Sequence, residues 1–119
     1  VELERIGDHA AGIAKLTIEL AKEPLLKPLI DIPRMAVVGR EMMRDSLSAY
    51  LNWDAEQARR TVARDTDIDQ LNDQVYRELL TYMLQDPRTI NRATYLLWVA
   101  HNLERIGDEA ARIARMVQR

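Results

Sequence analysis

Apolar residues recur at intervals of three and four along most of the chain, which is the period of an amphipathic α-helix. Pro24 and Pro28 interrupt this pattern, because proline cannot continue a helix and restrains the residue before it. No stretch alternates with period two for long enough to form a strand. The predicted helical segments are residues 1–23, 33–52, 54–85 and 87–118. The sequence therefore predicts an all-α fold.

The connections between the later segments are only one or two residues long. Asp54 and Asp86 each stand directly before a predicted helix, where an aspartate side chain can cap the first turn. Pro87 suits the first position of the helix that follows. Since short connections force successive helices to lie antiparallel, we expect an up-down helical bundle.

The last segment has the most regular core face, with apolar residues spaced alternately by three and four. Glu104 and Asp108 fall roughly 130–170° away from the centre of that face, and therefore share a different one. Small residues lie beside these two acids, which indicates either a closely approaching helix or space between the carboxylates. The predicted core residues are Leu96, Val99, Leu103, Ile106, Ala110, Ile113 and Val117. The small residues are Ala100, Gly107, Ala111 and Ala114.

The third segment carries acids within a stripe that is apolar at both ends. Asp65 and Asp69 occupy positions in this stripe, and Asp73 follows four residues later. Two unit charges about 5 Å apart repel by roughly 3 kcal/mol at an effective dielectric constant near 20. A partly buried cluster of this kind needs a cation, which is either an arginine or a metal ion; both interpretations stay open. The full stripe is Ala58, Val62, Asp65, Asp69, Asn72, Tyr76, Leu80 and Met83, and the candidate arginines are Arg60, Arg64 and Arg105.

The composition limits which side chains could bind a metal ion. The chain has no cysteine, so a metal would be held mainly by oxygen ligands, which suit iron, manganese, magnesium or zinc. The Glu-x-x-His signature of di-iron bundles is missing, and we expect His9 and His101 to lie outside any first ligand set.

A net charge of −2 argues against nucleic-acid binding. The longest uncharged run has 11 residues, about half of what a membrane span needs, and no signal peptide is evident.

An internal repeat is the most specific feature. Leu-Glu-Arg-Ile-Gly-Asp occurs at residues 3–8 and again at 103–108. Extended to 12 residues, the two copies agree at 10 positions and differ at 9/109 and 12/112. The offset of 100 residues corresponds to one three-helix unit. We therefore interpret residues 1–23 as the last helix of a preceding repeat and 31–119 as a complete second repeat, within a longer protein.

The doubled motif, together with Asp-x-x-x-Asp on the long helix, resembles the phosphate-uptake regulator (PhoU) family over essentially the whole chain. This resemblance implies a cytoplasmic, non-enzymatic accessory protein of the phosphate-specific ABC transporter. Such a protein would contact the transporter's ATPase subunit and a membrane sensor histidine kinase, repressing the phosphate-starvation response.

The family also carries Glu/Asp-x-x-x-Asp motifs that bind iron or zinc clusters in some members. By resemblance, Glu104 and Asp108 pair with Asp65 and Asp69, whereas the partner of the first-repeat motif would lie upstream of this chain. The six matching positions are Glu4, Asp8, Asp65, Asp69, Glu104 and Asp108.

Two other classes of protein fit the same pattern. One is a metal-dependent oxidase or hydrolase built on a carboxylate bundle, for which the missing Glu-x-x-His is unfavourable. The other is a metal-free dimerisation module. A bundle lacking its preceding helices would expose apolar residues such as Ile6 and Ile13, so we expect self-association through that face and a homo-oligomer.

Overall fold

The computed structural model describes residues 1–20 and 31–118, and within these ranges it contains helices and no strand. The elements are α1 (Glu2–Leu20), α2 (Asp31–Asn52), α3 (Ala55–Ala63), α4 (Asp65–Gln85), the 3₁₀ turn η1 (Pro87–Thr89) and α5 (Ile90–Gln118). The all-α prediction is confirmed, and the second segment begins at Asp31. The predicted end of the first segment, near residue 23, lies outside the described residues. The division into two repeats stays a prediction.

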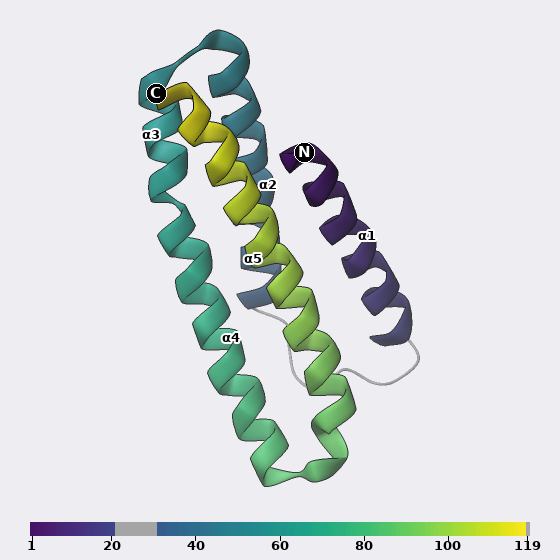
Figure 1. Ribbon diagram of the computed structural model, residues 1–119. Helices are drawn as coiled ribbons and strands as arrows, with labels where there is room; N and C mark the ends of the chain where they lie inside the picture. The colour runs from purple at the N-terminus through teal and green to yellow at the C-terminus, as the bar shows by residue number, and fades with distance from the viewer. Residues whose placement is uncertain (21–30, 119) are drawn as a thin grey trace.

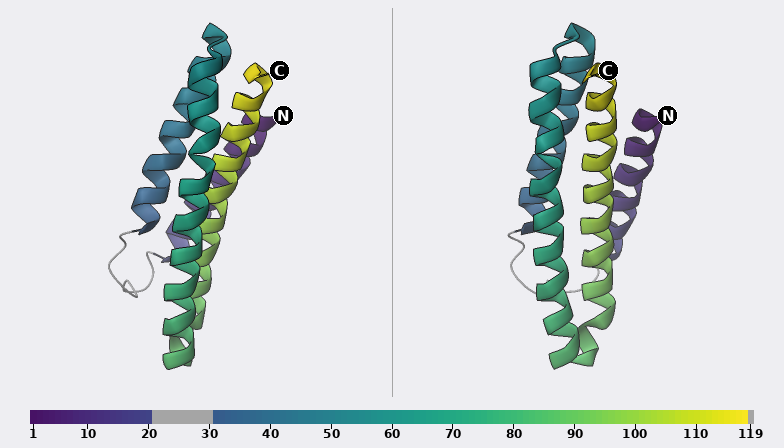
Figure 2. Two further views of the ribbon diagram at one scale, coloured as in Figure 1. Left: turned by 90° about the vertical axis from the view of Figure 1, so that its left-hand side faces the viewer. Right: turned by 60° about the vertical axis from the view of Figure 1, so that its left-hand side comes forward.

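The helices form an elongated antiparallel bundle with extents of 50 × 23 × 18 Å (Figures 1 and 2). α2 and α5 run in one direction, whereas α1 and the α3–α4 rod run in the other. α5 contacts α1, α2, α3 and α4, and α1 lies alongside α5 alone among the described helices. α5 is therefore the central element of the bundle.

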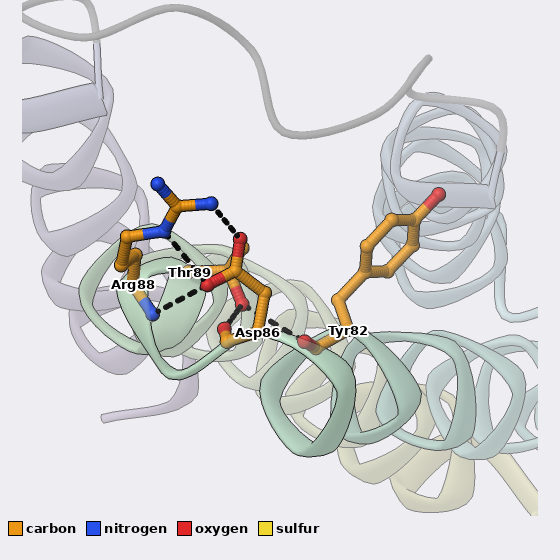
Figure 3. Close-up of polar contacts among 4 residues, drawn as sticks. All are labelled: Tyr82, Asp86, Arg88 and Thr89. Atoms are coloured by element: carbon orange, nitrogen blue, oxygen red, sulfur yellow. Dashed lines mark hydrogen bonds and ion pairs between the residues drawn. The ribbon is translucent and has the colours of Figure 1, made fainter.

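Aspartate caps form the two tight connections, as the sequence predicts. Oδ1 of Asp54 accepts a hydrogen bond from the backbone N–H of Gln57 at 3.2 Å. Oδ1 of Asp86 accepts one from the backbone N–H of Arg88 at 3.0 Å, and the Thr89 hydroxyl donates to the Tyr82 carbonyl at 3.1 Å (Figure 3). The bonds from Gln57 and Arg88 satisfy N–H groups that the start of a helix leaves without partners. The turn at Asp86 thereby fixes α5 antiparallel to α4.

The predicted continuous helix 54–85 is wrong in one respect, because it is divided into α3 and α4 at Arg64. The Arg64 backbone stays in the right-handed region (φ −73°, ψ −12°), and its N–H donates to the Thr61 carbonyl at 3.1 Å. This is the tighter bonding of a 3₁₀ turn. No proline or glycine lies near this position, so the sequence does not predict the break. The Arg64 side chain lies 3.5 Å from the carboxylate of Glu41 on α2, a contact between helices that local composition cannot reveal.

The predicted core face of α5 is confirmed, since all seven of its residues are buried. The small residues beside it are also buried: Ala100, Ala111 and Ala114 have no exposed surface. Burial of the large apolar residues of the core face stabilises the fold by about 1.5–3 kcal/mol for each side chain. The small strip is therefore a surface of close helix packing.

The stripe predicted for α4 is wrong. The buried apolar residues of α4 are Ile68, Val75 and Leu79, whereas Tyr76 and Leu80 of the predicted stripe are exposed. The true core face is rotated, because α5 and α2 together cover the side of α4 that carries Ile68. The acids of the predicted stripe consequently lie beside the core and not within it.

The predicted exposure of Ile6 and Ile13 is wrong. Ile6 is 7% exposed and packs with Ile106 and Ile113 of α5, and Ile13 joins the same cluster. These residues are covered within one chain, because α1 turns its apolar side towards α5. The oligomeric state itself stays a prediction.

Candidate metal centre

Four acids from two neighbouring helices lie at one place in the bundle. Asp65 and Asp69 occupy the first two turns of α4, and Glu104 and Asp108 lie in the middle of α5. Residues four apart stand on the same side of a helix. Since α4 and α5 are adjacent and antiparallel, the two acidic pairs can face one another (Figure 1).

Gly107 sets the separation of α4 and α5 at this place. A Cβ at position 107 would lie 3.0 Å from Cγ2 and 3.1 Å from Cδ1 of Ile68 on α4. These distances are tighter than most side-chain contacts, so any other residue would require Ile68 or α4 to shift by a few tenths of an ångström. A mid-helix glycine costs about 1 kcal/mol relative to alanine. Here that cost accompanies a close approach, which brings the acids of both helices within reach of each other.

The carboxylates form a compact group. Asp65, Asp69 and Asp108 each offer an oxygen within 4.8 Å of the others' oxygens, and in residues 1–20 and 31–118 this is the one such group of three or more acids, histidines or cysteines. Glu104 lies beside them, and its Oε2 accepts a hydrogen bond from Nδ2 of Asn72 at 3.1 Å. The structure thus brings together the four acids that the sequence pairs across two helices. Their role as metal ligands stays a prediction.

The surroundings disfavour the charged form of these acids. Burial raises the pKa of Asp65 to about 7, and a hydrogen bond to Asp108 and the charges of Asp108 and Asp69 add to the rise. Burial, followed by the charge of Asp108, raises the pKa of Asp69. The pKa of Glu104 is raised by burial and then by the charge of Asp69. Each carboxylate therefore has other carboxylates as its main electrostatic neighbours.

Few cations compensate this negative charge. Of the three candidate arginines, Arg105 faces the cluster, with Nη1 3.6 Å from Oδ2 of Asp108. Arg64 instead lies near Glu41, and Arg60 lies 3.7 Å from Glu56. Arg105 and Asp108 belong to the same helix, and among the described contacts none of the three candidate arginines pairs with Asp65 or Asp69. The charge of Arg115 opposes the rise in the pKa of Asp65 but does not outweigh it. Whether an arginine or a metal ion neutralises these acids stays open.

The donor set fits a hard or borderline cation. All four groups are carboxylates, the ligands that such ions prefer. Oδ1 of Asp65 is buried without a hydrogen-bond partner, which is costly for a carboxylate oxygen unless something else binds it. A cation placed among these oxygens would satisfy Oδ1 of Asp65 and neutralise the repulsion between Asp69 and Asp108.

The remaining predicted residues lie elsewhere. Glu4 and Asp8 are exposed on α1, and neither belongs to a group of three metal-binding residues in the described chain. Nδ1 of His9 lies 2.9 Å from Oδ1 of Asn102, and His101 is exposed. Both histidines are outside the carboxylate group, as expected.

The sequence interpretation missed two residues. Asn72 was counted in a stripe but given no role, although it holds Glu104. Glu109 has no exposed surface; its Oε1 lies 3.1 Å from Nη1 of Arg112 and 3.8 Å from Nη1 of Arg5, and its Oε2 has no partner. The available signal was that position 109 is one of two at which the repeated motif changes.

The bundle and its facing acid pairs define a class of all-α proteins with Glu/Asp-x-x-x-Asp motifs on adjacent helices. A model of the PhoU domain matches residues 32–117. The chain belongs to the PhoU family.

Relatives with curated names support this assignment. The chain is 43% identical over 104 residues to the "phosphate-specific transport system accessory protein PhoU homolog" of Aquifex aeolicus, covering 87% of this chain and 47% of that protein. The protein of the same name from Caulobacter vibrioides is 42% identical, with 98% of this chain and 51% of that protein covered. The chain thus spans about half the length of these relatives.

A solved structure has the same fold. The crystal structure of PhoU from Pseudomonas aeruginosa matches with a TM-score of 0.93 and 34% identity, over 98% of this chain and 56% of that one. Among the described helices of the present chain, none combines the length and the hydropathy required to cross a bilayer.

Proposed function

We propose that this chain forms part of a phosphate-transport accessory protein that regulates and does not catalyse. The observation that carries the proposal is the match to curated relatives of that name along 98% of the chain, at 42% identity. Because the chain spans about half of those relatives, the role belongs to the whole protein. The doubled motif and the all-α architecture support the same assignment.

The proposed protein works in the cytoplasm. It binds the ATPase subunit of the phosphate ABC transporter and a sensor histidine kinase, and it represses the phosphate-starvation response. It reaches the membrane only through these partners and binds no nucleic acid. The test is a pull-down of each purified partner by the full-length protein and by this chain. Capture of neither partner by the full-length protein would contradict the proposal.

The second part of the proposal is a metal ion held by Asp65, Asp69, Glu104 and Asp108. Iron or zinc is proposed first, and manganese or magnesium second. The ion would supply positive charge where the carboxylates repel each other. Glu4 and Asp8 are proposed as half of a second site, completed by residues outside this chain.

Elemental analysis tests the metal assignment. We expect bound metal to fall from wild type to the double variant Asp65→Ala/Asp69→Ala. A matched control is Asp67→Ala, which removes an exposed acid from the same helix. Equal metal content in all three proteins would refute the site and leave the fold unaffected.

We further propose that the protein is a homo-oligomer. Apolar residues line a hollow of about 210 Å³ at the end of the bundle where α1 begins: Val1, Leu3, Leu47, Tyr50, Ile113 and Met116. Val1 and Leu3 are 78% and 56% exposed. Leu3→Asp should therefore weaken self-association in sedimentation velocity, whereas Ala11→Asp, on an exposed position of the same helix, should not. The same apolar hollow would serve a metal-free dimerisation module, which is distinguished by the elemental analysis.

One observation favours an enzyme as the alternative. A carboxyl group with a pKa of about 7, such as Asp65, is suited to proton transfer at neutral pH. The absence of histidine from the cluster argues against an oxidase or hydrolase of the di-iron type. Turnover of oxygen or of phosphate esters by the metal-loaded full-length protein, lost in Asp65→Asn, would favour this alternative.

A further inference from the structure

The two copies of the repeated motif pack against each other. Nη1 of Arg5 on α1 lies 3.8 Å from Oε1 of Glu109 on α5, and Nδ1 of His9 lies 2.9 Å from Oδ1 of Asn102. Positions along α1 rise as their partners along α5 fall, so the two helices are antiparallel (Figure 1). Ile6 packs with Ile106 in the same interface.

This arrangement raises a problem of specificity. An antiparallel pair built from two copies of one motif is nearly symmetric, so the face of α5 that accepts α1 also matches α5 of a second copy. In such a pairing, Arg105 of the second copy would take the place of Arg5 beside Glu109. Ile106 of the second copy would likewise take the place of Ile6. Apolar contacts alone therefore do not distinguish the two pairings.

The two positions at which the motif copies differ both touch Asn102. Nδ2 of Asn102 donates to the Trp98 carbonyl at 2.9 Å, which leaves Oδ1 facing Nδ1 of His9. Nδ1 of His9 must therefore be the donor. The corresponding residue in the other copy is Glu109, whose carboxylate oxygens could only oppose Oδ1.

The second difference acts through size. A Cβ at position 12 would lie 3.3 Å from Oδ1 and 3.4 Å from Nδ2 of Asn102, so a side chain there would require Asn102 to shift by a few tenths of an ångström, whereas Gly12 fits without a change. The corresponding residue in the other copy is Arg112. In an α5–α5 pair, Arg112 of the second copy would fall on Asn102, and this would occur twice by symmetry.

We propose that His9 and Gly12, set against Glu109 and Arg112, determine which motif helices pair. α5 accepts α1, and it excludes α5 of a second copy of this chain. The specificity comes from one donor and one missing side chain opposite Asn102, while the shared apolar residues supply the attraction.

Spin labels on the full chain test the first half of the proposal. The chain has no native cysteine, so Thr17→Cys on α1 and Gln74→Cys on α4 can be labelled selectively. We expect one narrow distance distribution for the otherwise native chain and a broad one for Gly12→Arg. Arginine is the better helix former, so weaker α1 helicity would not explain the loss.

Two further variants complete this experiment. Ala14→Arg places the same residue on an exposed position of α1 and should keep the narrow distribution. Gly12→Arg/Asn102→Ala removes the obstructing side chain and should restore part of it. A narrow distribution for Gly12→Arg alone would overturn the proposal.

A residue exchange tests the second half. We compare His9→Glu/Gly12→Arg with the same chain carrying Glu109→His/Arg112→Gly as well. We expect α1 to be released from α5 in both variants. Only the fourfold variant also carries a histidine donor at position 109 and a glycine at position 112, which would lie opposite Asn102 of a second copy. Sedimentation velocity should show at least tenfold tighter dimerisation for the fourfold variant. Equal self-association of the two would overturn the proposal, and the comparison cancels any association through surfaces that both variants share.

Discussion

Gly107 on α5 faces Ile68 on α4 so closely that a Cβ would lie 3.0 Å from Cγ2 of Ile68. The equivalent position in the first motif copy is Gly7, where an added Cβ meets nothing within 4 Å. The same residue in the same motif therefore has two different environments, one tightly packed and one open.

We predict opposite effects of alanine at these two glycines. Gly107→Ala should lower the free energy of unfolding by about 1–3 kcal/mol, because overpacking outweighs the gain in helix propensity. Gly7→Ala should raise it by up to about 1 kcal/mol. Urea unfolding of both variants measures the difference. Equal effects in the two would show that Ile68 yields without cost.

The stability of the metal-free protein should depend on pH in a direction set by Asp65. Its pKa is raised from 3.8 to about 7, so the folded state binds a proton more tightly than the unfolded state. That contribution to stability is complete below about pH 4 and is lost as the pH rises through 7. The pKa values of Asp69 and Glu104 are also raised, so these residues act in the same direction.

The comparison of wild type with Asp65→Asn isolates this effect. In the presence of a chelator, the variant should lose less stability than wild type between pH 5 and 8, as measured by urea unfolding. Asp67→Asn, an exposed acid of the same turn, serves as the control. Parallel profiles for wild type and Asp65→Asn would contradict the assignment.

The affinity for a metal ion should increase with pH, whereas the stability of the metal-free protein should decrease. A carboxyl group must lose its proton before it can ligate a cation, so affinity should rise as the pH increases through about 7. Isothermal titration with zinc, or with iron under anaerobic conditions, measures the trend and the proton release. Affinity that is constant between pH 6 and 8 would exclude Asp65 from the ligand set.

Asn72 should support metal binding without being a ligand itself. Its amide donates to Oε2 of Glu104 at 3.1 Å and so orients that carboxylate. Removal of such an orienting group typically costs about 10–100-fold in metal affinity. We expect Asn72→Ala to weaken binding by about tenfold, whereas Gln74→Ala, an exposed amide on the same helix, should leave it unchanged. Unaltered affinity in Asn72→Ala would remove this role.

Glu109 should be dispensable for stability. Its carboxylate is fully buried with one unpartnered oxygen, whereas Arg5 and Arg112 are about half exposed and can be solvated without it. Replacing a buried ion by an apolar side chain of similar size is often neutral or stabilising. We expect Glu109→Met to raise the free energy of unfolding by about 1 kcal/mol in thermal or urea unfolding. A loss of more than 1 kcal/mol would show that the arginines compensate the burial fully.

The sequence predicts the helices well because each one has to bury a regular apolar face. The rotation of α4 could not be predicted with the same success. Two overlapping stripes run along it, one through Tyr76 and Leu80 and one through Ile68, Val75 and Leu79. Which stripe is buried depends on the position of α5 and α2, and a single helix carries no information about its neighbours.

The candidate site shows the same division. Spacing and repetition indicate that the acids of α4 and α5 converge, because these properties belong to the individual helices. The partners of Asn72 and Glu109 cannot be found in this way. Asn72 contacts a residue 32 positions away, and Glu109 is buried where α1 covers α5.

α5 is one uninterrupted helix of 29 residues, and it carries the acids that face α4 as well as the residues that face α1. The residues of α5 that face α4 and those that face α1 therefore move together when the helix rotates about its long axis. A rotation of α5 that changed the distance between Asp108 and α4 would also change the position of Asn102 relative to α1.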